Sequence, residues 1–242
     1  MLQKTRAIVL QVTDYSEASI IVRAYTESHG MQSFLVNSVR KPKARFAANL
    51  FQPLSLLEII AYIKKPGSLH RVAEVNASPA FQTIPYDTVK TTVAMFIAEV
   101  LYRSVREEET NSELFQFADY AIRLFDLHPE VISGFHLCFM IQLTRYLGFY
   151  PSGRYASGMQ WFDLQEGQFT PEPPRQHPYF LNPPSAEMLD KLLSLSLEES
   201  GKTGFNASAR RKLLEALVLY YELHHTQGTH IRSHQILSEV LS

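Results

Sequence analysis

The chain has 242 residues, of which 45% are hydrophobic and 19% are charged, and its formal net charge at pH 7 is −1. This composition is typical of a globular protein and excludes a disordered chain. No stretch approaches the ~20 consecutive apolar residues that span a bilayer, and the first residues do not show the basic segment and long apolar core typical of a secretory leader. We therefore expect a soluble, cytoplasmic protein. The single cysteine, Cys138, excludes an internal disulfide and a multi-cysteine zinc site, and we expect it to be a buried core residue.

The first 77 residues carry the signals of β-strands and turns. Five runs are rich in β-branched and aromatic residues and are separated by turn residues such as Gly30 and Gly67. A five-stranded barrel with a short helical insert between its third and fourth strands has the outline of an OB-fold. The predicted strands cover residues 7–12, 18–25, 31–39, 54–63 and 69–75, and the helical insert covers residues 44–51.

From about residue 81 the period of the apolar residues becomes helical. Asn111 or Ser112 and Asn206 are predicted N-caps, Pro129 is a predicted first helical residue, and Gly148 is a predicted C-terminal stop. The predicted helices cover residues 87–107, 112–125, 129–147, 186–197, 207–225 and 233–241.

Residues 150–184 interrupt the helices with a loop-rich insert, which contains a predicted hairpin around Glu166 and Gly167. The predicted fold class is therefore α+β. An OB-fold domain at residues 1–80 is followed by an all-helical domain at residues 81–242 that carries this insert.

Positive charge is concentrated in the first third of the chain. Residues 1–80 hold 10 Lys and Arg against 5 Asp and Glu, residues 81–150 hold 5 against 9, and residues 151–242 hold 8 against 10. Four of these cations lie between residues 40 and 45, directly after the third predicted strand. A local positive field on a near-neutral protein attracts a polyanion, and nucleic acid is the first candidate.

The predicted barrel supplies a surface for such a partner. In an OB-fold, the face of the second and third strands and the flanking loops hold oligonucleotides. Cations there would bind phosphates, and Tyr25, Phe34 or Phe46 would stack on bases if they face outward; burial in the barrel core is the alternative for these rings, and solubility alone is the alternative for the cations. The predicted DNA-binding residues are Arg40, Lys41, Lys43, Arg45, Lys64, Lys65, Arg23 and Phe34.

Signatures of catalysis are missing from the sequence. It has no phosphate-binding loop, no dinucleotide-binding glycine motif, no nucleophile elbow and no His-Glu-x-x-His motif. His224, His225, His230 and His234 gather near the C-terminus, where a metal-dependent hydrolase site is one hypothesis and a polar helix end is the other. We expect no enzyme activity, no catalytic residue, no cofactor and no bound metal.

Several segments resemble, in order and spacing, the bacterial recombination mediator family RecO. In the N-terminal domain they are residues 14–17, 25–31, 38–45 and 50–58, and the likeness continues at residues 98–101, 112–115 and 143–151. Many members of that family carry a four-cysteine zinc module after the last of these segments, whereas residues 152–174 contain no cysteine. The chain therefore resembles a zinc-lacking member.

The resemblance implies a non-enzymatic DNA repair and recombination factor. Such a factor binds single- and double-stranded DNA, anneals complementary strands and acts with RecR to load RecA onto DNA coated by single-strand-binding protein. The resemblance also implies that the basic loop contacts DNA and that the helical domain receives the tail of single-strand-binding protein. We further expect a nucleoid-associated monomer without a membrane partner. Because the guanidinium group of arginine suits a terminal carboxylate, four arginines are candidate partner-binding residues: Arg123, Arg145, Arg210 and Arg211.

The alternative to a DNA-binding mediator is an interaction adaptor whose helical domain binds peptide tails without direct DNA binding.

Overall fold

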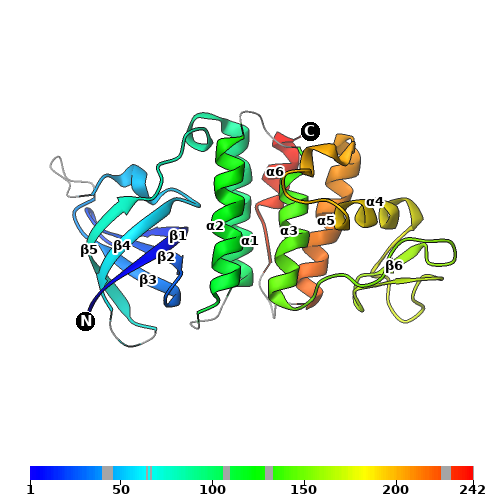
Figure 1. The fold of residues 1–242 in the computed structure, drawn as a ribbon, viewed down its shortest axis with the longest axis horizontal. Helices are drawn as coiled ribbons and strands as arrows, with labels where there is room; N and C mark the ends of the chain where they lie inside the picture. The colour runs from blue at the N-terminus through cyan, green and yellow to red at the C-terminus, as the bar shows by residue number, and fades with distance from the viewer. Residues whose placement is uncertain are drawn as a thin grey trace. The chain divides into compact units, whose positions relative to one another are not determined.

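A computed structural model of the chain describes residues 1–39, 46–63, 65, 67–105, 110–128, 133–224 and 230–241. The chain folds into two compact units, Met1–Leu127 and His128–Ser242 (Figure 1). The first unit contains a β-barrel and two long helices, and the second contains the remaining helices and a small sheet.

The first unit begins with a closed barrel whose strand order is β1-β2-β3-β5-β4. The strands β1 and β4 close it in antiparallel register, whereas β3 and β5 pair in parallel. This connectivity confirms the predicted OB-fold. The strands are β1 (Leu2–Asp14), β2 (Ile20–Thr26), β3 (Gly30–Val36), β4 (Leu56–Tyr62) and β5 (Leu69–Ala77), and the 3-10 helix η1 (Ala48–Phe51) lies between β3 and β4.

Two helices pack on the outer side of the barrel. A short 3-10 helix, η2 (Ile84–Tyr86), leads into α1 (Thr88–Ser104), which is followed by α2 (Ser112–Leu127) (Figure 1). On β1, Ile8 is fully buried although it alternates with the core residues Ala7 and Val9, because α1 packs against the outside of this strand. The predicted cap Asn111 is confirmed, since its side chain accepts the backbone N–H of Leu114 at 3.0 Å.

A buried polar network joins the connection between β5 and α1 to both helices. The carboxylate of Asp126, at the end of α2, accepts the backbone N–H groups of Gln82, Thr83 and Ile84 at 2.8, 3.0 and 3.0 Å. Lys90 of α1 is buried beside it and donates to the Thr83 hydroxyl at 2.6 Å. Burial lowers the pKa of Lys90, and the nearby carboxylate of Asp126 opposes that shift.

The second unit consists of helices around a small sheet of order β7-β6-β8. The predicted hairpin around Glu166 and Gly167 is confirmed, because Phe162 of β6 pairs with Phe169 of β7 in antiparallel register. The elements are α3 (Phe135–Leu147), β6 (Trp161–Asp163), β7 (Gln168–Thr170), β8 (Phe180–Leu181), α4 (Pro183–Leu193), the 3-10 helix η3 (Ser200–Thr203), α5 (Ala207–His224) and α6 (His234–Val240).

The predicted helix boundaries in this unit rest on capping residues. Gly148 ends α3 in the left-handed conformation with φ 85°, and the Asn206 side chain accepts the N–H of Ala209 at 2.9 Å at the start of α5. Both predicted caps are confirmed. The helix predicted from residue 186 begins instead at Pro183, behind the N-cap Asn182, and Pro129 lies outside the described residues.

Aromatic packing holds the loop-rich insert together. The rings of Phe162 and Phe169 lie 5.0 Å apart, and the ring of Phe162 lies 6.0 Å from that of Tyr220 on α5. The Tyr220 hydroxyl in turn donates to the backbone carbonyl of Phe149 at 2.7 Å. The insert is therefore an ordered part of the second unit, built without cysteine.

The change from strands to helices and the division into compact units fall at different places. Strands give way to helices between Ala77 and Thr88, near the boundary proposed from the sequence, whereas the units divide between Leu127 and His128. No helix within the described ranges is long and apolar enough to cross a bilayer.

Candidate nucleic-acid interface

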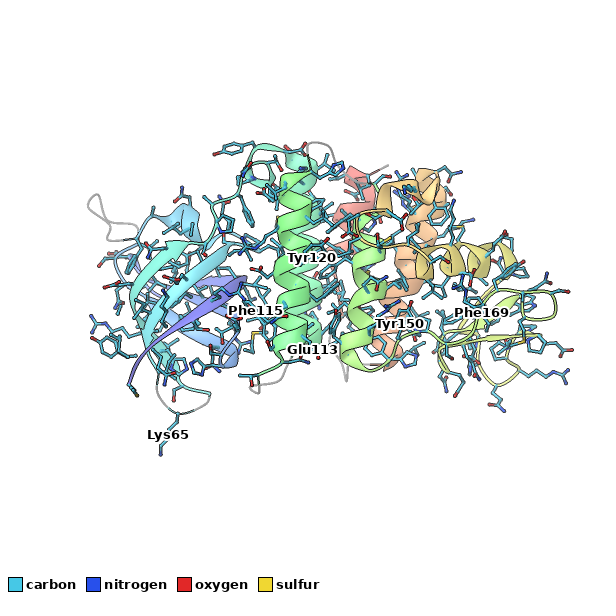
Figure 2. The ribbon with its side chains drawn as sticks, in the orientation of Figure 1. Lys65, Glu113, Phe115, Tyr120, Tyr150 and Phe169 are labelled. Carbon is cyan, nitrogen blue, oxygen red and sulfur yellow. The ribbon has the colours of Figure 1, made fainter. Side chains whose placement is uncertain are left out.

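The helices of the first unit cover part of the outer face of β2. Arg23 is exposed, but its guanidinium donates to the Tyr102 hydroxyl of α1 and lies 5.5 Å from the centre of that ring. Tyr25 is buried: its ring lies 5.9 Å from that of Phe115 on α2, and its hydroxyl donates to the carbonyl of Asn111 at 3.1 Å. Figure 2 shows Phe115 on the side of α2 that faces the barrel. Arg23 therefore has an intramolecular partner, and Tyr25 has no free face for a base.

The prediction that Phe34 stacks on a base is wrong. Phe34 alternates with outward-facing Ser33 and Leu35 on β3, and its side chain is 0% exposed in the barrel core. Phe46 is buried against the same core. Phe34 and Phe46 thus contribute to the stability of the barrel, because burial leaves neither ring available to a ligand.

Five of the predicted phosphate contacts fall outside the described residues: Arg40, Lys41, Lys43, Arg45 and Lys64. The run at 40–45 belongs to the connection between the end of β3 at Val36 and the start of η1 at Ala48. Its proposed role in binding DNA therefore stays a prediction.

Lys65 is the remaining predicted cation, and it is exposed on the connection between β4 and β5. Figure 2 shows its side chain extending away from the barrel. Among the described residues it has no carboxylate within ion-pair distance. By contrast, Lys4 pairs with Glu58 at 2.9 Å on the same barrel.

Sequence reasoning did not select Arg71, a further cation on this side of the barrel. Arg71 is exposed on β5, opposite Leu35 of β3 and Tyr62 of β4, and no described carboxylate pairs with it. The sequence signal that could have identified Arg71 is its position in the strand directly after the turn that contains Lys64 and Lys65. The described part of the barrel therefore presents Lys65 and Arg71 as cations without an acidic partner.

The four candidate partner-binding arginines have different surroundings. Arg123 belongs to the first unit and is bound by Asp119 at 2.7 and 3.0 Å and by the Ser78 carbonyl at 2.9 Å. The guanidinium group of Arg123 is therefore already bound by a carboxylate of the same chain.

The other three belong to the second unit. Arg210 donates to the carbonyls of Phe205 and Leu241 at 2.7 and 3.2 Å, and Arg211 donates to that of Ser238 at 3.2 Å, so both help to hold α6 on α5. Arg145 is exposed and lies 4.3 Å from the ring centre of Tyr150. Of the four, Arg145 is the one that keeps an exposed guanidinium and binds no backbone carbonyl or carboxylate among the described residues.

The described histidines near the C-terminus do not gather into a metal-binding group. Within the described ranges, no three His, Cys, Asp or Glu side chains are grouped so as to hold a metal ion. His224 lies 2.9 Å from the carbonyl of Leu164, and His230 lies 2.8 Å from the Glu222 carboxylate, whereas His225 is not described.

Cys138 is buried in α3, as predicted. Burial raises the pKa of its thiol to about 12. The thiolate, which is the nucleophilic form of cysteine, is therefore disfavoured at neutral pH.

Comparison with known proteins connects both halves of the chain to one family. The model "Recombination protein O N terminal" matches residues 1–81, and "Recombination protein O C terminal" matches residues 85–232. The chain is similar to the DNA repair protein RecO of Bacteroides fragilis, with 38% identity over 241 residues that cover 99% of each chain. It is also similar to the proteins of that name from Phocaeicola vulgatus, at 36% over 243 residues and 100% of each chain, and Flavobacterium johnsoniae, at 37% over 242 residues and 99% of each chain.

Proposed function

The chain belongs to the Recombination protein O family and therefore serves DNA repair and recombination, and from this premise we propose that it acts as a recombination mediator. In this proposal it binds single- and double-stranded DNA and anneals complementary strands. Together with RecR, it helps to load RecA onto DNA coated by single-strand-binding protein.

One observation supports direct DNA binding above all. The cationic run at residues 40–45 belongs to the same part of the chain as a closed OB-fold barrel, and this barrel exposes Lys65 and Arg71 without an acidic partner among the described residues. Cations at such positions neutralise phosphates and release condensed counterions. Neutralised strands repel each other less, so two complementary strands can approach and pair. This mechanism makes and breaks no covalent bond.

We assign the protein partners to the helices. The tail of single-strand-binding protein would be received by an exposed arginine of the second unit, and Arg145 fits this role best because its guanidinium is exposed beside Tyr150. A terminal carboxylate would bind the guanidinium fork, and an apolar tail side chain would pack on the tyrosine ring.

A binding titration tests the proposal. We expect the full chain to raise the fluorescence anisotropy of labelled single- and double-stranded oligonucleotides at moderate salt, and to accelerate the pairing of two complementary strands. An interaction adaptor would bind peptide tails but neither form of DNA, and would leave the pairing rate unchanged.

A further inference from the structure

Tyr62 and Arg71 form an outward-facing pair at the end of the β4–β5 hairpin where the connecting loop joins the two strands. They lie directly opposite each other in the antiparallel register of β4 and β5. The adjacent pair, Ala61 and Val72, lies in the barrel core, so Tyr62 and Arg71 share the outer face of the sheet. Arg71 also faces Leu35 of β3, one strand further along. Because neighbouring strands are ~4.8 Å apart, one ligand can touch both side chains of the pair.

Both side chains are open to a ligand. The Tyr62 side chain is 51% exposed, and neither its hydroxyl nor the Arg71 guanidinium has a hydrogen-bond partner in another side chain within the described chain. The cations of the neighbouring strand β1 differ, because Lys4 pairs with Glu58 at 2.9 Å and Arg6 pairs with Glu27 at 2.6 Å. An aromatic ring and an unpaired cation therefore stand side by side on this surface.

We propose that Tyr62 and Arg71 form a subsite for one nucleotide of a single strand, which rests on the DNA binding proposed above. The Tyr62 ring stacks on the base, Arg71 binds the adjoining phosphate, and Lys65, three residues beyond Tyr62 in the connection to β5, binds the next phosphate along the strand. Stacking on an aromatic ring tolerates any base, because every base has a π-face. The subsite therefore adds affinity without sequence preference.

The chemistry of the pair favours a single strand over a duplex or a peptide. In a duplex the bases already stack on one another, so an exposed ring gains a base only from an unpaired strand. The positive charges of Arg71 and Lys65 select a polyanion. Tyr62 thus distinguishes single strands from duplexes, whereas Arg71 strengthens binding to both.

The test compares Tyr62→Ala with the wild-type full chain on three probes: a single-stranded oligonucleotide, the same oligonucleotide with abasic sites, and a duplex. We expect Tyr62→Ala to weaken single-strand binding about 5- to 100-fold and to change binding to the other two probes less than about twofold. Tyr62→Phe keeps the ring and is expected to bind like the wild type. Arg71→Gln is expected to weaken binding to all three probes and to reduce the salt slope by about one.

Tyr86→Ala is the matched control, because Tyr86 is an exposed tyrosine of η2 in the same unit (83% exposed) and lies outside this pair. Wild-type affinity of Tyr62→Ala for the single strand, in a protein that binds DNA, would overturn the subsite and leave the proposed function intact. An equal loss on all three probes would also overturn base stacking. A wild-type protein that binds none of the probes would overturn the proposed function together with the subsite.

Discussion

The cations of the barrel differ in whether another side chain binds them. Those that are bound help to hold the fold, and the others face solvent. The guanidinium of Arg6 forms two hydrogen bonds with Glu27, at 2.8 and 2.6 Å, and lies 5.2 Å from the ring centre of Phe115. The hydrogen bonds with Glu27 raise the pKa of Arg6 and lower that of Glu27. Arg71 has neither kind of partner among the described residues, so it is available to an external anion.

His136 makes folding depend on pH. It is buried in α3, and burial, with a smaller contribution from Arg210, lowers its pKa to about 3. In the unfolded chain a histidine titrates near 6.5. The unfolded state therefore binds the proton first, and we expect the free energy of unfolding to fall by up to about 1.4 kcal/mol per pH unit as the pH drops from about 6.5 toward 3.

Urea unfolding between pH 7.5 and 5 measures this dependence. His136→Gln removes the titrating group, so its unfolding free energy should fall less steeply with decreasing pH than that of the wild type. Identical slopes for wild type and His136→Gln would contradict the assignment.

At the scale of elements, the connection between β5 and α1 depends on Asp126. Its carboxylate is buried and accepts three backbone N–H groups from residues 82–84, which lie in the middle of that connection. These N–H groups precede or begin η2, where no helical carbonyl is available to them. A single side chain thus holds the connection against the end of α2.

Asp126→Ala would leave those three donors without an acceptor. We expect it to lower the free energy of unfolding by about 2–4 kcal/mol, because unsatisfied buried donors and lost charge-assisted hydrogen bonds are both costly. Asp126→Asn keeps one acceptor oxygen and should lose less. Urea denaturation measures both effects, with Glu113→Ala, at an exposed position of α2, as the control. A wild-type unfolding midpoint for Asp126→Ala would refute this role.

Local signals in the sequence predicted most elements but not the contacts between them. The cap Asn111 and the turn at Gly167 act within four residues of their partners, so the sequence alone reveals them. Lys90 falls within a helical pattern and gives no local sign of burial. Its burial arises because the carbonyl of Phe125, 35 residues away, and the Thr83 hydroxyl accept its hydrogen bonds.

At the scale of the molecule, the sequence predicted the barrel and the place of its basic loop better than the direction of individual side chains. The fourth predicted strand, residues 54–63, is apolar almost throughout, so alternation could not tell its inner face from its outer face. A register shift between Ile60 and Ala61 then helps to set which residues of β5 face Tyr62. The strand that carries Phe34 does alternate, but its inner face includes the buried polar residue Gln32, so polarity alone does not show which face is the core. The pairing of Tyr62 with Arg71 depends on strand register, which the sequence pattern does not reveal.

The distribution of charge along the chain indicates which cations are left for the proposed binding of DNA. Residues 1–80 carry 10 cations against 5 acids, and Lys4 and Arg6 are paired with carboxylates on the barrel. Arg23 already binds the Tyr102 hydroxyl. The cations that remain for a partner are therefore expected to be those of the run at 40–45, together with Lys64, Lys65 and Arg71.

The salt dependence of DNA affinity, compared between the wild type and the triple variant Arg40→Ala, Lys41→Ala and Lys43→Ala, tests the central claim most directly. We expect the logarithm of the wild-type association constant for a single strand to fall linearly with the logarithm of salt concentration. The variant should bind every sequence more weakly, and its slope should be shallower by roughly two, since each phosphate contact on a single strand contributes about 0.7. A control that neutralises Arg175, Lys202 and Lys212, three exposed cations of the second unit, should keep the wild-type slope. An unchanged slope in the triple variant would contradict the claim that this loop binds the phosphate backbone.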